Sequence, residues 1–304
     1  MIHLHWHSHY SLLEAVWSPW KIVDKAKELW MESIAITDYH WMYWAIEFYQ
    51  DAQKAWIKPI IWTELEMIWE NQEDNKTYKT VLIAKNYTWY ENLLKLVSYA
   101  HVSWYTNKPT INQEVVKKYS SWLVAIQGWE NSQIWSMAVN NFPKEQIKET
   151  IKKWQQIFGE ENFFLEIIAQ NEKEFKNTKK SNQTLLEISN DISCKAIISN
   201  NYSYINKEDK QAYEALICIK EWKAFDWNKI KWDYHIMSKE EIQKTMKENW
   251  YDKEEIENLI SNNINLSKEC NLELQLWKIL FPKYEANEKI QDLYQKEKDN
   301  LVEK

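Results

Sequence analysis

The stretch AITDYHWMYWAIEFYQDAQKAWIKPIIWTELEM, residues 35–67, contains most of one strand–helix–strand unit. Apolar runs at 33–37 and 57–62 predict strands, and the apolar spacing over 42–55 predicts the helix between them. Two strands joined through a helix lie parallel in one sheet, because the helix carries the chain back to the end where the first strand began. The unit therefore predicts an α/β fold with a parallel sheet.

The same alternation of strand and helix continues along most of the chain. Further strands are predicted at 2–7, 79–84, 121–127, 162–168 and 194–199. Further helices are predicted at 19–29, after the N-cap Ser18, and at 88–101, 131–140, 144–158, 173–191 and 207–221. The repetition indicates a distorted (β/α)7 barrel, and in α/β barrels the chemistry gathers at the C-terminal ends of the strands.

Beyond about residue 222 the sequence becomes polar and rich in helix formers. The segments 238–249 and 252–263 predict amphipathic helices that pack on the barrel. The charged C-terminal stretch has no apolar element after it, which indicates the start of a connection to a further domain. The expected organisation is one domain over 1–280, with a barrel core at about 1–205 and peripheral helices at about 206–280, followed by the connection over 281–304.

Composition and charge restrict the class of protein. The 45% hydrophobic and 27% charged residues are typical of a globular domain, and no apolar run approaches the roughly 18 residues of a membrane span. The net charge of −7 argues against binding nucleic acid by bulk electrostatics, and all 38 basic residues are lysine. Three widely spaced cysteines without a CxxC pair, and the lack of a signal peptide, predict a reduced cytoplasmic protein.

Glycine is rare in this chain and tryptophan is abundant. There are 2 glycines and 20 tryptophans in 304 residues, whereas an average chain of this length has about 21 glycines. Trp30 and Trp56 both stand where a helix ends just before a strand, a position that favours a left-handed glycine. We therefore hypothesise that most of these tryptophans are glycines in the natural protein, encoded by UGA codons that its translation system reads as glycine. The alternative is an aromatic-rich core or a base-stacking surface.

The chemistry-bearing residues gather at the predicted strand ends. His5 and His7 point to the same side of the first strand, because alternate side chains of a strand share a face. Glu14 follows shortly after them, Glu64 follows the third strand, and His40 follows the second. Imidazole and carboxylate groups at one rim are suitable ligands for a divalent ion. The spacing alone leaves open a weak metal-binding histidine tract or polar residues on an exposed strand.

Several motifs resemble those of the polymerase-and-histidinol-phosphatase (PHP) domain that opens bacterial DNA polymerase III alpha subunits. They are HLHWHSHYSLLEA near the N-terminus, the stretch 35–67 quoted above, and TVLIAKNYTWYENLLKLVS at 80–98. Weaker similarity continues through KPTI, LVAIQG, FFLEI, AIISNNYSYI, DYHIMSKEEI and NLELQLWKILFPKYE. The similarity to the family improves where Trp44, Trp56 and Trp62 are read as glycine.

Metal-binding members of the family have nine ligands that hold up to three ions and hydrolyse phosphoesters. The resemblance carries four of these positions onto His5, His7, Glu64 and Glu14, where Glu14 replaces an aspartate. The other five are lost, and His40 could compensate for one of them. The lost positions are occupied by Tyr39, Lys79, Trp129, Asn201 and Ser203. This residual set implies one divalent ion at most, Zn²⁺ or Mn²⁺.

The resemblance implies a role in DNA replication as part of a DNA-directed DNA polymerase, a nucleotidyltransferase. In the family, the polymerase aspartates and their Mg²⁺ ions, as well as the contacts to DNA, lie in domains C-terminal to this one. We expect this fragment to be inactive alone, and to serve as a scaffold that docks a proofreading exonuclease and other replicase subunits. The alternatives are a freestanding metal-dependent PHP phosphoesterase and a non-enzymatic protein unrelated to replication.

Overall fold

The computed structural model describes residues 2–69, 76–102, 108–120, 123–173, 175–225 and 233–276, together with Gln295. The chain divides into two units, Met1–Glu273 and Leu274–Lys304. The second unit is described only at 274–276 and at Gln295, so the predicted connection over 281–304 lies almost entirely outside the described residues.

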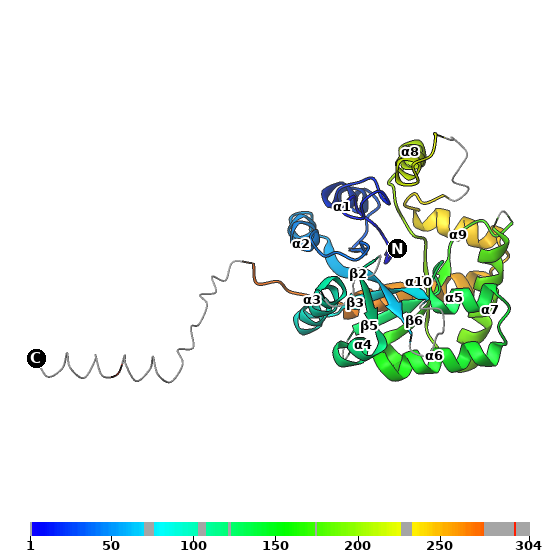
Figure 1. Ribbon diagram of the computed structural model, residues 1–304. Helices are drawn as coiled ribbons and strands as arrows, with labels where there is room; N and C mark the ends of the chain where they lie inside the picture. The colour runs from blue at the N-terminus through cyan, green and yellow to red at the C-terminus, as the bar shows by residue number, and fades with distance from the viewer. Residues whose placement is uncertain are drawn as a thin grey trace, which may run out of the picture. The chain divides into compact units, whose positions relative to one another are not determined.

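A seven-stranded sheet forms the centre of the first unit, and helices surround it (Figure 1). Its strands are β1 (Ser33–Ile36), β2 (Lys58–Ile68), β3 (Thr77–Ala84), β4 (Thr110–Asn112), β5 (Leu123–Gln127), β6 (Phe163–Ile168) and β7 (Ala196–Ser199). Their order is β1-β2-β3-β5-β6-β7, and β4 pairs with β2. The α/β barrel class predicted from the sequence is confirmed.

The expectation of a wholly parallel sheet is wrong at β3. This strand runs antiparallel to both β2 and β5, while the pairs β1–β2, β2–β4, β5–β6 and β6–β7 are parallel. Only residues 69–76 separate β2 from β3, and a parallel crossover needs about a dozen residues or more. The short connection therefore forces β3 to return antiparallel.

The N-terminal segment 2–7, predicted as the first strand, bridges the two edges of the sheet without forming a regular strand. On one side, the N–H of Thr37, just after β1, donates to a carbonyl of the segment (2.7 Å). On the other side, the N–H of His7 donates to the carbonyl of Tyr202 (2.9 Å), and the N–H of Tyr202 donates to the carbonyl of His5 (3.2 Å). The segment therefore links the two edges of the curled sheet through backbone hydrogen bonds.

The helices lie close to their predicted positions. They are α1 (Pro19–Glu28), α2 (Ala45–Lys54), α3 (Tyr87–Val102), α4 (Gln113–Tyr119), α5 (Gln133–Val139), α6 (Lys144–Phe158), α7 (Lys176–Ile192), α8 (Lys210–Lys220), α9 (Lys239–Glu248) and α10 (Lys253–Glu269). Short 3₁₀ turns lie at Glu160–Asn162 and Lys207–Asp209. Only α4 and the short β4 before it have no counterpart among the predicted elements.

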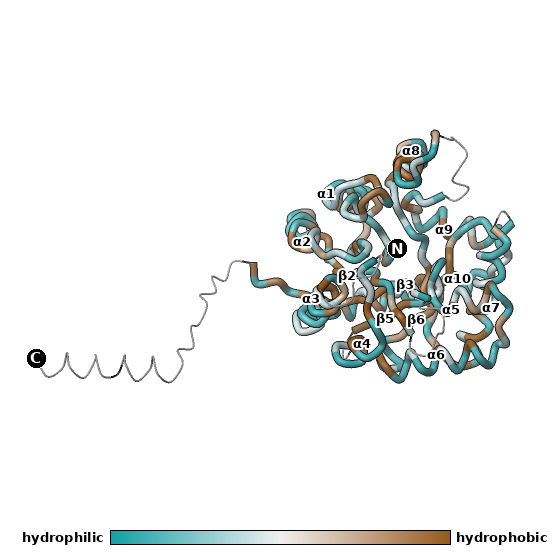
Figure 2. The backbone as a smooth tube through the Cα atoms, in the orientation of Figure 1, coloured by the Kyte–Doolittle hydropathy of each residue, from teal (hydrophilic) through white to brown (hydrophobic). Residues whose placement is uncertain are grey.

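Most helices are amphipathic and bury one face against the sheet. Apolar and polar residues alternate along α6 and α7 (Figure 2), and the buried side chains of α6 recur at helical spacing. Capping boxes fix the starts of α9, with Ser238 and Glu241, and of α10, with Asp252 and Glu255. Among the described residues, no helix combines the length and apolarity of a membrane span.

Four helices end in a tryptophan with a left-handed backbone. The φ angles are 53° at Trp30 after α1, 60° at Trp56 after α2, 54° at Trp222 after α8 and 74° at Trp250 after α9. The prediction of left-handed positions at Trp30 and Trp56 is confirmed. All four side chains are almost fully exposed, from 83% to 96%.

Candidate metal centre

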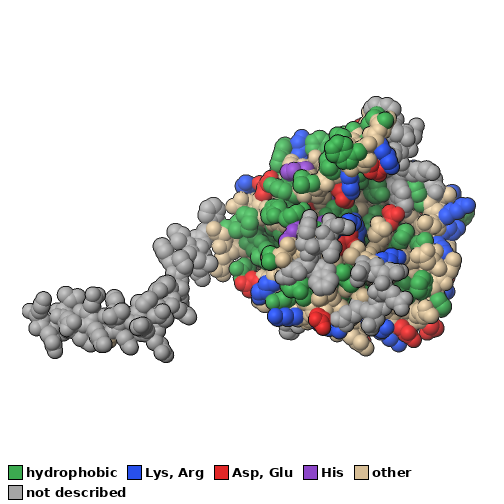
Figure 3. All heavy atoms as spheres, in the orientation of Figure 1, with side chains coloured by type: hydrophobic (Ala, Val, Ile, Leu, Met, Phe, Trp, Pro, Cys, Tyr) green, Lys and Arg blue, Asp and Glu red, His purple; other side chains and the backbone are tan. Residues whose placement is uncertain are grey.

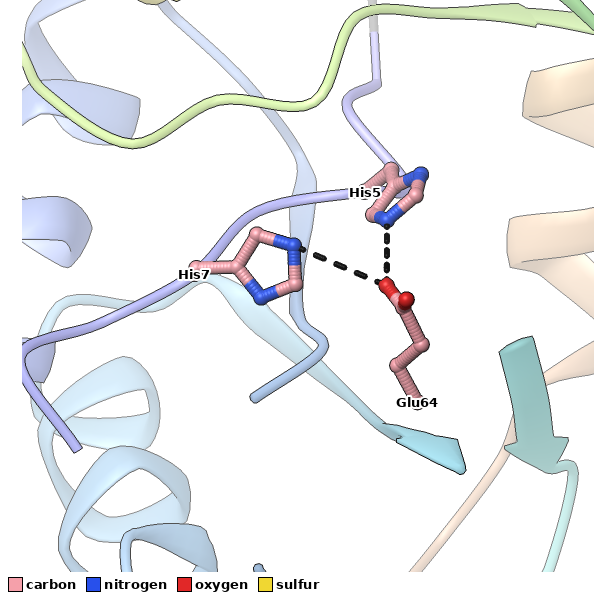
Figure 4. Close-up of side chains that lie close together, drawn as sticks. All are labelled: His5, His7 and Glu64. Atoms are coloured by element: carbon pink, nitrogen blue, oxygen red, sulfur yellow. Dashed lines mark hydrogen bonds and ion pairs between the residues drawn. The ribbon is translucent and has the colours of Figure 1, made fainter. Parts of the chain in front are cut away.

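Three predicted ligands come together inside the barrel. His5 and His7 extend from the N-terminal segment, and Glu64 extends from β2 (Figure 4). One ligand atom from each lies within 4.8 Å of the other two, and all three side chains are buried. The Oε2 atom of Glu64 lies 3.2 Å from His5 Nε2 and 3.8 Å from His7 Nε2. The alternation of side chains along the segment places both imidazoles toward the same carboxylate.

A carboxylate that sequence reasoning missed orients the first histidine. Glu166 on β6 places its Oε1 atom 2.9 Å from Nδ1 of His5. Burial by itself lowers the pKa of His5, but the negative charges of Glu166 and Glu64 outweigh it and raise the pKa to about 9. His5 is therefore a cation between two carboxylates. The available signal was a lone acid in the otherwise apolar strand FFLEII.

The second oxygen of Glu64 pairs with a lysine. Lys79 on β3 places Nζ 3.1 Å from Oε1 of Glu64, and 3.8 Å from the ring centroid of Tyr39. Burial would raise the pKa of Glu64, but the positive charge of Lys79 and the hydrogen bond from His5 hold it well below its usual range. Glu64 is thus ionised, with cations on both of its oxygens.

His7 carries a buried nitrogen without a hydrogen-bond partner. Among the described residues nothing hydrogen-bonds its Nε2 atom, and its ring stacks on Tyr39 at 4.0 Å between centroids. Burial, and then the positive charge of His5, lower the pKa of His7 well below its ordinary value. A neutral imidazole nitrogen that lies beside a carboxylate without a hydrogen bond of its own is a suitable metal ligand. His5, His7 and Glu64 therefore have the donor types and spacing for one divalent ion, but an ion there would have to displace the proton of His5 and approach a carboxylate that already pairs with Lys79.

The loop after the histidines is tied to the buried side chain of Asp38. The N–H and Oγ of Ser8 donate to its carboxylate at 2.6 and 2.5 Å, and Oγ of Ser11 donates at 2.6 Å. Burial raises the pKa of Asp38 to about 7 in spite of these hydrogen bonds, which lower it. The carboxyl group therefore acts as a support for the loop that leads away from His7.

Two predicted ligands lie outside the cluster of donor atoms. Glu14 pairs with Lys220 of α8 (2.6 Å). His40 has a φ angle of 62°, and its carbonyl accepts a hydrogen bond from Nε2 of His101 (2.8 Å). Both belong to the connections around the rim, but neither side chain joins the three donors.

Four of the five lost positions nevertheless surround the cluster. Besides Lys79 and Tyr39, Asn201 donates through Nδ2 to the Tyr39 hydroxyl (3.2 Å), and the ring of Trp129 lies 5.7 Å from that of His5. Ser203 is buried and forms backbone hydrogen bonds with Val16 and Tyr234. Uncharged groups and an ammonium therefore stand where further ligands were expected.

The pattern of a known family matches the part of the chain that contains this site. The PHP domain matches residues 3–170, which is more than half of the 304 residues. The chain belongs to the PHP domain family. The three clustered donors lie inside the matched span, as do Glu166 and Lys79.

Curated relatives of this PHP domain are subunits of a DNA polymerase. DNA polymerase III subunit alpha of Borreliella burgdorferi is 31% identical over 293 residues, which cover 92% of this chain and 24% of that protein. The corresponding subunits of Treponema pallidum and Thermus aquaticus are 26% and 27% identical, covering 93% and 90% of this chain. The chain spans about a quarter of the length of the relatives it matches, 23% to 24%.

Within the described residues of this PHP domain, no second group of three histidine, cysteine, aspartate or glutamate side chains lies as close together. Three donors are enough for one ion with an open coordination position. They are too few to offset the charge of several dipositive ions, because Lys79 adds a positive charge to the same site. The arrangement is therefore that of a candidate site for a single ion, with three donor side chains.

Proposed function

We propose that this chain is the N-terminal PHP region of a replicative DNA polymerase III alpha subunit and takes part in DNA replication. The observation that carries the proposal is the extent of the similarity. The PHP match ends at residue 170, whereas the alignment with the Borreliella burgdorferi subunit covers 92% of the chain. The similarity therefore extends into the helices α8 to α10, beyond the residues that PHP domains share.

In this role the region is a structural part of a nucleotidyltransferase that works in the cytoplasm. Template-directed synthesis, with its Mg²⁺ ions and its contacts to DNA, would belong to domains outside this segment. The net charge of −7 is consistent with that division, because it does not favour bulk attraction to a polyanion. The region itself would stabilise the subunit and bind other replicase subunits, including a proofreading exonuclease.

Exposed apolar side chains on the loop after the histidines, before α2 and on α8 support a docking role. Leu12, Tyr43 and Ile219 are 74%, 70% and 63% exposed. The hydrogen bond from the Tyr10 hydroxyl to Glu47 joins the loop of Leu12 to α2, which follows Tyr43, and the ion pair of Glu14 with Lys220 joins this loop to α8, which carries Ile219. Figure 3 shows apolar side chains gathered over α1, α2 and α8 on this face. Such a surface is typical of a protein–protein contact.

The test is complex formation with the exonuclease subunit encoded in the same genome. We expect the two purified chains to elute together as a complex in size-exclusion chromatography with light scattering. The variants L12E and Y43E should weaken the complex, whereas the control F142E, at a side chain 47% exposed beyond α5, should leave it intact. Separate elution of the wild-type chains would refute docking. The polymerase assignment fails independently if no polymerase palm follows in frame in the genome.

A freestanding phosphoesterase is the second candidate, favoured only by the donors His5, His7 and Glu64. A Zn²⁺ or Mn²⁺ ion held by these residues would supply an activated water. We expect no hydrolysis of an aryl phosphodiester above that of the H7A variant in either metal. Turnover that depends on His7 would instead support the phosphoesterase.

A further inference from the structure

The position of Lys79 is fixed by the antiparallel pairing of β3 with β2. In this register Lys79 lies opposite Glu66, and Val81 lies opposite Glu64, so that Lys79 and Glu64 are diagonal neighbours on one face. Glu66 is engaged by Lys108 at 3.2 Å, and Lys79 pairs with Glu64 at 3.1 Å. Each of the two glutamates of β2 therefore forms an ion pair with a different lysine.

The backbone and side chain of Lys79 are held on several sides. Its N–H donates to the carbonyl of Asn131 (3.0 Å), and its carbonyl accepts a hydrogen bond from Nε2 of Gln127 (3.0 Å). The ammonium group lies over the ring of Tyr39, a further favourable contact for a cation. These contacts therefore fix both the backbone and the ammonium group of Lys79 within the site.

Glu64 presents one oxygen to the histidines and the other to the lysine. Its side chain is 1% exposed, and a buried carboxylate needs a compensating charge. We propose that the Lys79 ammonium takes the place of a divalent ion: it neutralises Glu64, lets the domain fold without a metal, and opposes the binding of an ion at His5 and His7. A dication at Oε2 of Glu64 would share one carboxylate with the ammonium at Oε1, and the two cations would repel.

The test compares zinc binding by the wild type with that of K79H, which exchanges the cation for a ligand. We expect the wild-type thermal midpoint to be unaffected by EDTA. K79H should bind one Zn²⁺ per chain about 100-fold more tightly than the wild type in calorimetry, the size of effect that groups around a metal have. The matched control K108M removes the neighbouring Lys–Glu pair and should bind like the wild type.

Adding H7A to K79H should abolish the gain, which locates the ion. The proposal is overturned if the wild type and K79H bind zinc with equal affinity. It is also overturned if EDTA lowers the thermal unfolding midpoint of the wild type. If K79H is unfolded without metal but folds when zinc is added, the result supports it. None of these results depends on polymerase or exonuclease partners, so the outcome is separate from that of the proposed function.

A second inference rests on the four tryptophans with left-handed backbones. In each case the tryptophan N–H donates to the carbonyl three residues back, and the next N–H donates to the carbonyl five residues back. The pairs are Trp30–Lys27 with Met31–Ala26, Trp56–Gln53 with Ile57–Ala52, Trp222–Ile219 with Lys223–Cys218, and Trp250–Lys247 with Tyr251–Met246. This is the hydrogen-bond pattern of a Schellman helix end, at the position where glycine is the usual residue.

Nothing in the structure favours tryptophan at these positions. The rings are 83% to 96% exposed and bury almost no apolar surface. Inside the core, the indole N–H groups of Trp6 and Trp62 are buried without a hydrogen-bond partner among the described residues. Buried indole N–H groups usually find an acceptor. The four exposed rings gain little from burial, and the two buried indoles leave an N–H without an acceptor. Both kinds of position therefore favour a smaller residue that has no polar side-chain group.

We infer that Trp30, Trp56, Trp222 and Trp250 are glycines in the natural protein, inserted at UGA codons. The gene and the protein from its natural source test this together. UGA at all four codons, with glycine in the corresponding peptides by mass spectrometry, is the expected result. UGG codons, or peptide masses that contain tryptophan, would overturn the inference.

Discussion

Replacing Trp30, Trp56, Trp222 and Trp250 together by glycine should stabilise the domain. A left-handed conformation costs a residue with a Cβ roughly 1–2 kcal/mol, and all four φ angles lie between 53° and 74°. Glycine avoids this cost but loses about 0.5–1 kcal/mol through its more flexible unfolded chain. The net gain is about 0.5–1 kcal/mol at each site. The four sites terminate different helices and should add, which gives about 2–4 kcal/mol in total.

The assay is urea unfolding followed by circular dichroism, supported by the thermal midpoint. A gain of this size should raise the midpoint by roughly 5–10 °C for a domain of this length. The control is Trp154→Gly, because Trp154 is 1% exposed within α6 and its Nε1 donates to Gln133 (2.9 Å). That change should destabilise by at least about 3 kcal/mol. An unchanged or lower free energy of unfolding for the quadruple variant would refute the reasoning about the helix ends.

Three further changes test the packing and charges around the site. Gly128→Ala should cost at least about 2 kcal/mol in urea unfolding, because φ is +138° and a Cβ would lie 2.4 Å from the carbonyl oxygen of Glu166; a cost below about 0.5 kcal/mol would contradict this close approach. Burial lowers the pKa of His3 to about 3, so the unfolded state takes up its proton first and stability should fall as the pH drops from about 6.5 towards 3, by at most about 1.4 kcal/mol per pH unit. H3Q should remove that part of the slope, and an identical slope would exclude His3 as its source. E166Q should lower the pKa of His5 from its raised value of about 9, measured by NMR titration of the imidazole; an unchanged value would show that Glu64 alone holds the proton.

The sequence predicts the helices and strands well because their apolar spacing is local information. The predicted helix at 144–158 agrees with α6 at both ends, and the predicted strand at 162–168 agrees with β6 to within one residue. The direction of β3 was missed because the parallel arrangement was extended to all the strands, although no helix was predicted between the strands at 57–62 and 79–84. The length of the connection over 69–76 was visible and is the feature that decides the direction.

The site was predictable to the extent that it depends on alternation and on strand ends. Alternation accounts for His5 and His7, which share a side of the extended N-terminal segment. Glu64 was expected after a strand, but it lies inside β2, because that strand continues past the predicted end at 62 to Ile68. The partner of Glu14 follows from neither rule, because Lys220 lies 206 residues away and reaches it only through the packing of α8 on the rim. Glu166 was missed for a different reason: a single acid in an apolar strand has no sequence neighbour that reveals what it faces.

The error about β3 and the chemistry of the site have one cause. Had β3 been parallel to β2, its first residues would lie beside the first residues of β2 and not beside the half of the strand that follows Glu64. Because β3 returns antiparallel, its beginning lies beside the end of β2, and the register brings Lys79 diagonally next to Glu64. The same hairpin geometry would bring a histidine at this position to the same carboxylate. On the proposal made above, the side chain at residue 79 separates a Glu64 that pairs with a lysine from a Glu64 that is free to bind a metal ion.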